Sequence, residues 1–271
     1  MSYFGFLALF LGGPLLLLLF LTWRDRRQGR LLTDRLGNWA PQTAIIAHII
    51  VAILYTTPWD NYLVATRVWW YDPELVTGIV LGWVPLEEYI FFILQTLLSG
   101  LWLLFLARRL APAHDLPADN LPLRRGTTLV AFLIWLGAAA ILWLGWWPGT
   151  YLGLELIWAM IPMMIQLAFG ADIIWHYRRV VLLTILSTTL YLSAADAVAI
   201  GSGTWTIDPA QSLQIYLGGI LPIEEFVFFL VTNVMVTFGM VLVLARHSQT
   251  RLEALLDRYA VRLTPGRKSS R

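Results

Sequence analysis

Long apolar stretches separated by short polar loops recur along the whole 271-residue chain. Several of them run for about 18 residues or more with almost no charge, and a helix needs roughly 20 such residues to cross a bilayer. We therefore expect an all-α integral membrane protein with about seven transmembrane helices, near residues 3–23, 39–58, 78–106, 129–147, 151–171, 179–200 and 211–245. Arginines follow the first stretch and do not precede it, the reverse of a cleavable signal peptide, so we treat this stretch as a mature helix.

The basic residues are confined to one end of these helices. If the N-terminus lies outside, 18 of the 19 Lys and Arg residues fall in cytoplasmic segments, and only Arg67 falls outside. Cytoplasmic loops retain Lys and Arg, so this distribution predicts an external N-terminus, a cytoplasmic C-terminus and a multi-pass protein of the plasma membrane. The basic tail from Arg246 onward is expected to be solvated, or to lie on the inner leaflet as an amphipathic helix around residues 252–263.

The second half of the sequence repeats the first. Residues 84–92 (VPLEEYIFF) match residues 221–229 (LPIEEFVFF) at an offset of 137. Upstream, at an offset of 136, the matching pairs are Asp60 with Asp196, Trp69 with Trp205, and Asp72-Pro73 with Asp208-Pro209. Such agreement indicates an internal repeat. We expect one three-helix repeat at residues 1–110, a linker and connecting helix at 111–150, a second repeat at 151–245 and a basic tail at 246–271.

Each repeat carries a Pro-x-Glu-Glu motif within a predicted span. The motif residues are Pro85, Glu87 and Glu88, then Pro222, Glu224 and Glu225. The predicted helices place the acids about ten residues from the outer end, where a charged group costs roughly 2.5–3.5 kcal/mol. Burial and a neighbouring acid favour the neutral carboxyl group, so each motif is a candidate general acid. The prolines are expected to kink the helices and open space beside the acids.

The connecting helix returns the chain to the outside before the second repeat begins. The two repeats are therefore expected to be parallel, related by a pseudo-twofold axis along the membrane normal. This places both acid motifs at one depth, and we expect them to face a single shared cavity.

Other side chains near the motifs have two interpretations each. Four phenylalanines lie one turn below the acids, namely Phe91, Phe92, Phe228 and Phe229. Their ring faces could stabilise a cation, or the rings face lipid or pack against neighbouring helices. Gln95 lies on the same polar helix face as Glu88. His48 is either a proton relay or a packing residue. Glu155 either lines the cavity or lies at the membrane interface.

The remaining polar candidates lie at predicted outer helix ends. Capping and turn formation explain Asp60, Asn61, Arg67 and Asp196, although Asp60 and Arg67 could pair over the cavity mouth. The tryptophans near these ends are expected to join an interfacial aromatic belt, and they are Trp69, Trp70, Trp146 and Trp147.

Three stretches of the first repeat resemble a known family. Residues 55–64 (YTTPWDNYLV), 70–73 (WYDP) and 85–92 (PLEEYIFF) are similar to the small membrane lycopene cyclases of the two-subunit bacterial type. In that family each subunit has three helices and one such motif. The chain resembles the fused form of archaeal and fungal members, with residues 1–110 similar to one subunit and about 150–245 similar to the other.

The resemblance implies ring formation at the ends of lycopene in carotenoid biosynthesis, without net oxidation, and β-carotene as the expected product. An acid would protonate the terminal double bond, a neighbouring double bond would attack the cation, and a base would remove a ring proton. It implies Glu87, Glu88, Glu224 and Glu225 as the catalytic residues, with acid and base unassigned. The expected partners are the carotenoid, the bilayer and other carotenoid-pathway enzymes, and none is a nucleic acid.

Competing functions find less support in the sequence. A retinal protein needs a lysine in its last helix, and the only lysine is Lys268 in the tail. A membrane prenyltransferase would need aspartate-rich motifs, yet Asp115 and Asp119 stand alone in a Pro-rich loop. A proton-coupled transporter remains an alternative, since parallel repeats and buried acids also suit alternating access. The chain has no cysteine and no dinucleotide-binding glycine motif, so we expect no flavin and no metal.

Overall fold

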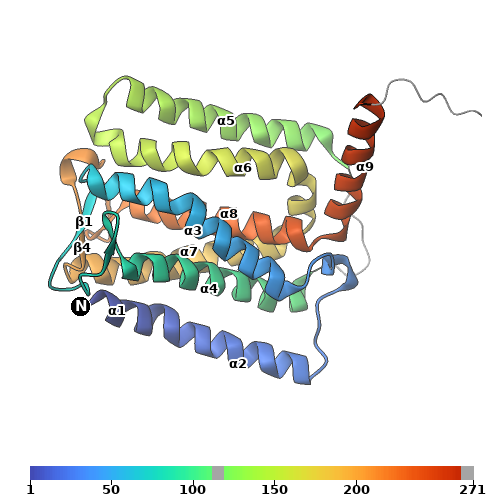
Figure 1. The fold of residues 1–271 in the computed structure, drawn as a ribbon, viewed down its shortest axis with the longest axis horizontal. Helices are drawn as coiled ribbons and strands as arrows, with labels where there is room; N and C mark the ends of the chain where they lie inside the picture. The colour runs from blue at the N-terminus through green and yellow to red at the C-terminus, as the bar shows by residue number, and fades with distance from the viewer. Residues whose placement is uncertain (112–118, 264–271) are drawn as a thin grey trace, which may run out of the picture.

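Seven long helices lie side by side in the computed structural model, which describes residues 1–111 and 119–263, with side chains up to residue 257 (Figure 1). Seven helices among the described residues are long and apolar enough to cross a membrane, as the sequence predicts. The first crossing joins α1 (Tyr3–Phe6), η1 (Leu7–Gly12) and α2 (Gly13–Arg27). The others are α3 (Pro41–Ala65), α4 (Leu86–Leu110), α5 (Leu121–Trp143), α6 (Thr150–His176), α7 (Arg178–Gly201) and α8 (Ile223–Leu244).

The helices pack in a bundle with a distinct structure at each end. The pair α5 and α6 forms one edge of the bundle, α1 and α2 form the opposite edge, and the other helices lie between them (Figure 1). Short strands gather at the end that holds the N-terminus, which we call the hairpin end. They are β1 (Trp69–Tyr71), β2 (Val80–Leu81), β3 (Val84–Pro85), β4 (Trp205–Ile207), β5 (Tyr216–Leu217) and β6 (Leu221–Pro222). Single 3-10 turns complete the connections, at η2 (Asp34–Leu36), η3 (Trp147–Gly149) and η4 (Pro209–Gln211).

The third and seventh spans begin later than predicted. Residues before α4 form a hairpin in which β2 pairs with β3, and residues before α8 form a hairpin in which β5 pairs with β6. Gly82 lies in the turn of the first hairpin, between β2 and β3, with a φ of +73°. This conformation favours glycine and is incompatible with a continuous α-helix. Pro85 and Pro222 are therefore the N-cap residues of α4 and α8. The predicted proline kinks are therefore absent from α4 and α8, and that prediction is wrong. The acids lie in the first turn of each helix, and not ten residues from its outer end as predicted.

Positions that match in the two halves meet at the centre of the bundle. In the antiparallel pair β1–β4, Trp70 lies opposite Thr206, at an offset of 136 residues. Deeper in the bundle, the Gln95 side chain donates to the hydroxyl of Thr232, 2.9 Å away and 137 residues later. Direct contact between equivalent positions is what a twofold axis produces.

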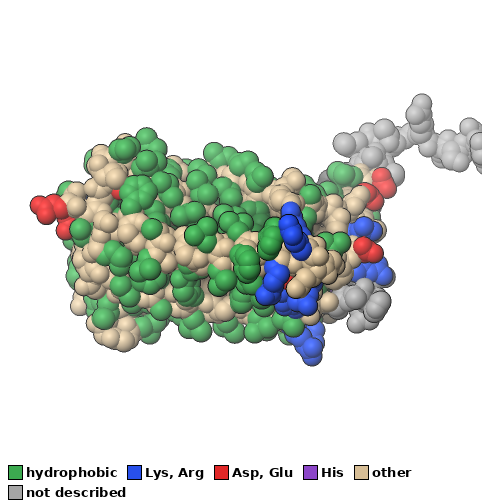
Figure 2. Space-filling view, turned by 90° about the horizontal axis from the view of Figure 1, so that it is seen from below, with side chains coloured by type: hydrophobic (Ala, Val, Ile, Leu, Met, Phe, Trp, Pro, Cys, Tyr) green, Lys and Arg blue, Asp and Glu red, His purple; other side chains and the backbone are tan. Residues whose placement is uncertain are grey.

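The opposite end, which we call the arginine end, carries the basic side chains (Figure 2). Buried Asp25 there accepts hydrogen bonds from Arg109, with Nη2 2.8 Å from Oδ1. Helix α9 (Arg246–Leu263) crosses this end of the bundle. Its Arg251 donates to Asp172 of α6 at 2.7 Å, so the first part of the predicted basic tail is a helix packed on the protein. Asp115 and Lys268 lie outside the described residues.

Candidate active site

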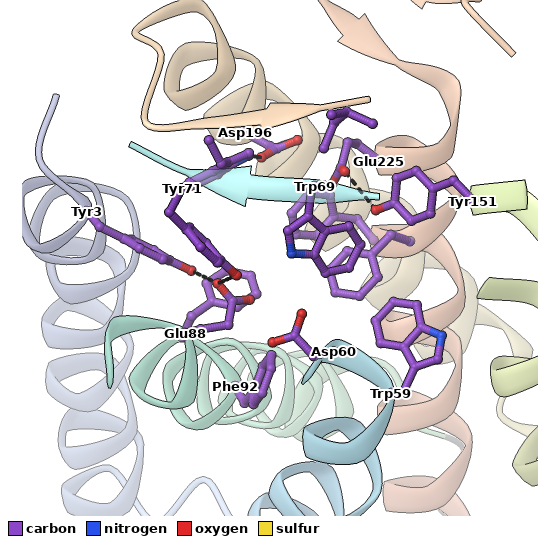
Figure 3. A pocket seen from close by; sticks show the side chains of 15 residues that line it. Tyr3, Trp59, Asp60, Trp69, Tyr71, Glu88, Phe92, Tyr151, Asp196 and Glu225 are labelled. Atoms are coloured by element: carbon purple, nitrogen blue, oxygen red, sulfur yellow. Dashed lines mark hydrogen bonds between the residues drawn. The ribbon is translucent and has the colours of Figure 1, made fainter. Parts of the chain in front are cut away.

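A small cavity lies between the first turns of α4 and α8, covered by the β1–β4 pair. Its volume is about 40 Å³. Four acidic side chains line it, namely Asp60, Glu88, Asp196 and Glu225. Figure 3 shows Glu88 and Glu225 on opposite sides, with Asp60 directed between them. Since all four are at most 8% exposed, the hairpin end buries four carboxyl groups around one space.

Glu88 accepts two hydrogen bonds from tyrosines. The hydroxyls of Tyr3 and Tyr71 both donate to its Oε2, Tyr71 from 3.0 Å (Figure 3). Burial raises the pKa of the Tyr71 hydroxyl well above its usual value, and the negative charge of Glu88 adds to that effect. Tyr71 therefore keeps its proton and remains a donor. Two hydroxyl donors favour the charged form of the carboxyl group that accepts them.

Glu225 has a different environment. Its Oε1 accepts one hydroxyl hydrogen bond, from Tyr151 at 2.7 Å. Glu155 lies one helical turn after Tyr151 on α6 and interacts electrostatically with Glu225. Glu155 is fully buried, and neither of its oxygens has a hydrogen-bond partner among the described residues. A second acid beside Glu225 disfavours two simultaneous negative charges.

The sequence suggested that Asp60 and Asp196 cap helix ends or form turns. This prediction is wrong, because both aspartates line the cavity. Neither oxygen of Asp60 has a hydrogen-bond partner in the described part of the chain. Asp196 accepts from the indole of Trp205, with Nε1 3.0 Å from Oδ1. A buried carboxyl group without donors strongly favours its neutral form, because no group compensates for the loss of water. Asp60 is therefore the acid of the cavity least able to carry a charge.

The first glutamate of each motif does not line the cavity. The backbone N–H of Thr77 donates to Glu87 Oε1 at 2.6 Å, and the N–H of Leu213 donates to Glu224 Oε1 at the same distance. Both glutamates are fully buried and tie the loop ahead of their hairpin to the start of the helix. This geometry indicates that Glu87 and Glu224 anchor these loops to α4 and α8.

Aromatic rings form most of the remaining wall. All four predicted phenylalanines line the cavity: Phe91, Phe92, Phe228 and Phe229. Trp59 stacks on Phe228 with ring centroids 5.9 Å apart and an interplanar angle of 5°. Trp69 also lines the cavity and is 8% exposed, so its predicted place in the interfacial belt is wrong. Ring faces around a water-poor space can stabilise a cation without attacking it.

The other predicted residues lie outside this cavity. Asn61 holds the β2–β3 hairpin by accepting from the N–H of Trp83 at 2.7 Å. Arg67 has a positive φ of 62° at the turn before β1. The alternative pair between Arg67 and Asp60 does not form within the described residues, since both Asp60 oxygens lack hydrogen-bond partners there.

A separate, larger groove adjoins the cavity. It has a volume of about 480 Å³ and lies among α3, α4, α6 and α8. His48 and Gln95 line this groove, and His48 Nδ1 donates to the Ala44 carbonyl at 2.7 Å. Phe92 and Phe228 line both spaces and thus separate them. The larger of the two spaces therefore lies beside the acids and not around them.

Sequence reasoning missed the three tyrosines that donate to the glutamates. Tyr3 and Tyr151 are 148 residues apart, the same offset as Pro14 and Pro162 in the first and fifth spans. The predicted three-helix repeats include both spans, so a residue-by-residue comparison at this offset would have aligned the two tyrosines. Tyr71 carries no such signal, because Ile207 stands at the matching position in the second half. In the described part of the chain, no group of three or more His, Asp or Glu residues could hold a metal.

The fold and the site define a seven-helix membrane protein with an acid-lined, aromatic cavity. The sequence profile of the family described as lycopene cyclase matches residues 2–106 and 148–243. The chain belongs to this family and is an enzyme that closes rings at the ends of a linear carotenoid.

Curated relatives cover both the single-chain and the larger fused forms. The chain is 40% identical to a lycopene beta-cyclase of Halobacterium salinarum over 252 residues, which are 90% of this chain and 98% of that protein. It is 35% identical to a bifunctional lycopene cyclase/phytoene synthase of Podospora anserina, over 71% of this chain and 33% of that protein. The corresponding enzyme of Aspergillus niger is 37% identical over the same shares. No solved structure is significantly similar.

Proposed function

We propose that this chain converts lycopene to β-carotene, and that the cavity carboxyl groups donate and accept the protons. The observation that carries the proposal is the convergence of four buried carboxyl groups on one space walled by aromatic rings. The reaction needs only an acid, a base and protection of a carbocation from water. The product is proposed from the beta-cyclase of Halobacterium salinarum, to which the chain is similar over nearly its whole length.

We assign the proton donor to Asp60. Its carboxyl group is buried, points into the cavity and has no hydrogen-bond partner in the described structure, so it holds its proton (Figure 3). It transfers this proton to the terminal double bond of lycopene, leaving a tertiary cation. The electron pair of a neighbouring double bond then forms the ring-closing carbon–carbon bond and moves the cation into the ring.

We assign the base to Glu88. The two tyrosine hydroxyls that it accepts stabilise its carboxylate form. The carboxylate stabilises the ring cation and removes one ring proton, whose bonding electrons become the new ring double bond. One proton enters and one leaves, so the product is an isomer of the substrate. Proton transfers among the cavity acids then restore neutral Asp60.

We further propose that Glu225 and Asp196 complete the cavity, and that Glu87 and Glu224 position the loops above it. Phe91, Phe92, Phe228 and Phe229 would stabilise the cation, and no metal or organic cofactor takes part in these steps.

We also propose the domain boundaries and the membrane orientation. The contacts between matching positions support two parallel repeats at residues 1–110 and 151–245. Arginines concentrated at one end support a cytoplasmic arginine end in the plasma membrane (Figure 2). Other carotenoid-pathway enzymes are proposed partners in that membrane.

Expression in a lycopene-accumulating bacterial host tests the function. Pigments are extracted and separated by chromatography, and we expect β-carotene to replace lycopene. An ε-ringed product would overturn the proposed ring type. Unchanged lycopene in cells that hold well-folded protein in the membrane would overturn the proposed function.

A further inference from the structure

We propose that the groove among α3, α4, α6 and α8 binds the polyene chain of the substrate while its reacting end occupies the acid cavity. The inference rests on the proposed function, because it assumes a long linear hydrocarbon as ligand. The groove would be a binding site in addition to the acid cavity. The polyene would extend through it from the hairpin end toward the arginine end, between α3 and α6.

The groove lies directly beside the acid cavity. Phe92 and Phe228 line both spaces, so movement of two ring side chains joins them. The cavity itself, at about 40 Å³, is too small for an end group together with its chain. The substrate must therefore occupy adjoining space, and the groove provides about 480 Å³ of it.

The length and direction of the groove also suit a polyene. Along α8 its lining runs from Phe228 to Val243, which spans roughly 22 Å at the helical rise per residue. Trp39 lines the same groove and comes just before α3, near the arginine end. The groove is thus elongated parallel to the helices.

The lining is apolar where a hydrocarbon would contact it. Val51, Ala52, Ile161 and Ile165 form facing walls from α3 and α6. The hydrogen-bonding capacity of several polar lining atoms is used within the protein, as His48 donates to Ala44 and Thr232 donates to the Phe228 carbonyl at 2.7 Å. Binding would therefore be driven by burial of apolar surface.

The matching groove in the other half is partly closed. It lies among α2, α4 and α7 and has a volume of about 290 Å³. Trp102 lines it and donates to the Ser187 hydroxyl at 2.7 Å, which links α4 to α7 across the groove. The position 137 residues after Trp102 is Gly239, which has no side chain and leaves room for the His48 ring. This substitution opens one groove and narrows the other, so the polyene has a single preferred site.

A tryptophan placed in each groove tests the assignment. Ala47→Trp fills the proposed groove below His48, and the control Leu17→Trp adds the same side chain to the groove that contains Trp102. Lycopene retained by the purified, detergent-solubilised protein is measured from its visible absorbance, and conversion is measured separately. We expect Ala47→Trp to lose at least about tenfold in both, since binding depends on buried apolar area, while Leu17→Trp stays within about twofold of wild type.

Retention separates this inference from the proposed function. If the wild-type protein binds lycopene, loses this binding on Ala47→Trp and yet forms no ring, the proposed lycopene conversion is refuted and the proposed polyene-binding groove is supported. Wild-type retention by Ala47→Trp, or equal loss in Leu17→Trp, would overturn the groove and indicate that it holds lipid acyl chains only. Should Ala47→Trp fail to fold, as judged by its melting temperature, Ile165→Trp blocks the same groove from α6 and carries the same expectations.

Discussion

The hydroxyls of Tyr3 and Tyr71 both donate hydrogen bonds to Glu88, whereas among the described residues Glu225 accepts one tyrosine hydrogen bond, from Tyr151. Both glutamates lie in the first turn of a helix, where backbone N–H groups favour negative charge equally. The number of tyrosine donors and the neighbouring acid Glu155 therefore distinguish the two sites. This difference is why we assign the carboxylate base to Glu88.

Removal of one donor should slow ring formation without unfolding the protein. Tyr71→Phe keeps the aromatic ring but loses a hydrogen bond to a charged group, worth about 1.5–3 kcal/mol. We expect the conversion of lycopene by purified protein to fall by roughly tenfold or more. Tyr62→Phe, at an exposed site of α3, serves as the control and should convert lycopene at the wild-type rate. Unchanged conversion by Tyr71→Phe would argue against a charged Glu88.

Adjacent glutamates should respond differently to the same change. Glu87→Gln keeps an oxygen that can accept from the Thr77 N–H, so we expect ring formation to stay within about tenfold of wild type. Glu88→Gln cannot carry the negative charge and should lose about a hundredfold or more of the activity. Pigment analysis of matched cultures, normalised to membrane protein, measures both. Equal losses in the two variants would place both glutamates in the same role.

The two hairpins show where sequence patterns reach their limit. Residues 78–85 and 211–222 carry no charge, are largely apolar and precede apolar helices, so hydropathy extends the helices through them. Glycines with positive φ precede the two helices, which begin only after the N-cap prolines at 85 and 222. Backbone conformation of this kind leaves little trace in hydropathy. The hairpins in turn bring Glu87 and Glu224 against the preceding loops and leave Glu88 and Glu225 facing the cavity.

A pair of glycine variants tests the contribution of the first hairpin. A Cβ at Gly82 would lie 2.2 Å from Asn61 Oδ1, whereas a Cβ at Gly78 would meet no atom within 4 Å, and both residues have positive φ. Gly82→Ala should therefore destabilise the protein by more than about 1 kcal/mol, through strain and the loss of the Asn61 contact. Gly78→Ala should show the smaller loss. Thermal unfolding in detergent measures both, and equal melting temperatures would contradict the proposed anchoring by Asn61.

Across the bundle, the sequence predicted the number of spans and the acid motifs but only part of the site. Hydropathy and the repeat are strong signals, so seven spans followed directly from them. The positions of Asp60 and Asp196 in the cavity wall could not be predicted in this way, because an acid near a helix end is usually a cap. These two aspartates are buried by the packing of α3, α7 and the β1–β4 pair. The unequal grooves depend on single substitutions, such as Gly239 for Trp102, that a repeat alignment treats as ordinary divergence.

The buried acid that begins the reaction is best tested with Asp60→Asn beside Asp196→Asn, since these aspartates occupy matching positions of the two halves. Each variant is purified and its initial rate of ring formation from lycopene is measured, with the melting temperature as a check on folding. We expect Asp60→Asn to lose about 10²–10⁴-fold, the usual contribution of a general acid, and Asp196→Asn to lose much less. A folded Asp60→Asn protein that closes rings at the wild-type rate would contradict the assignment.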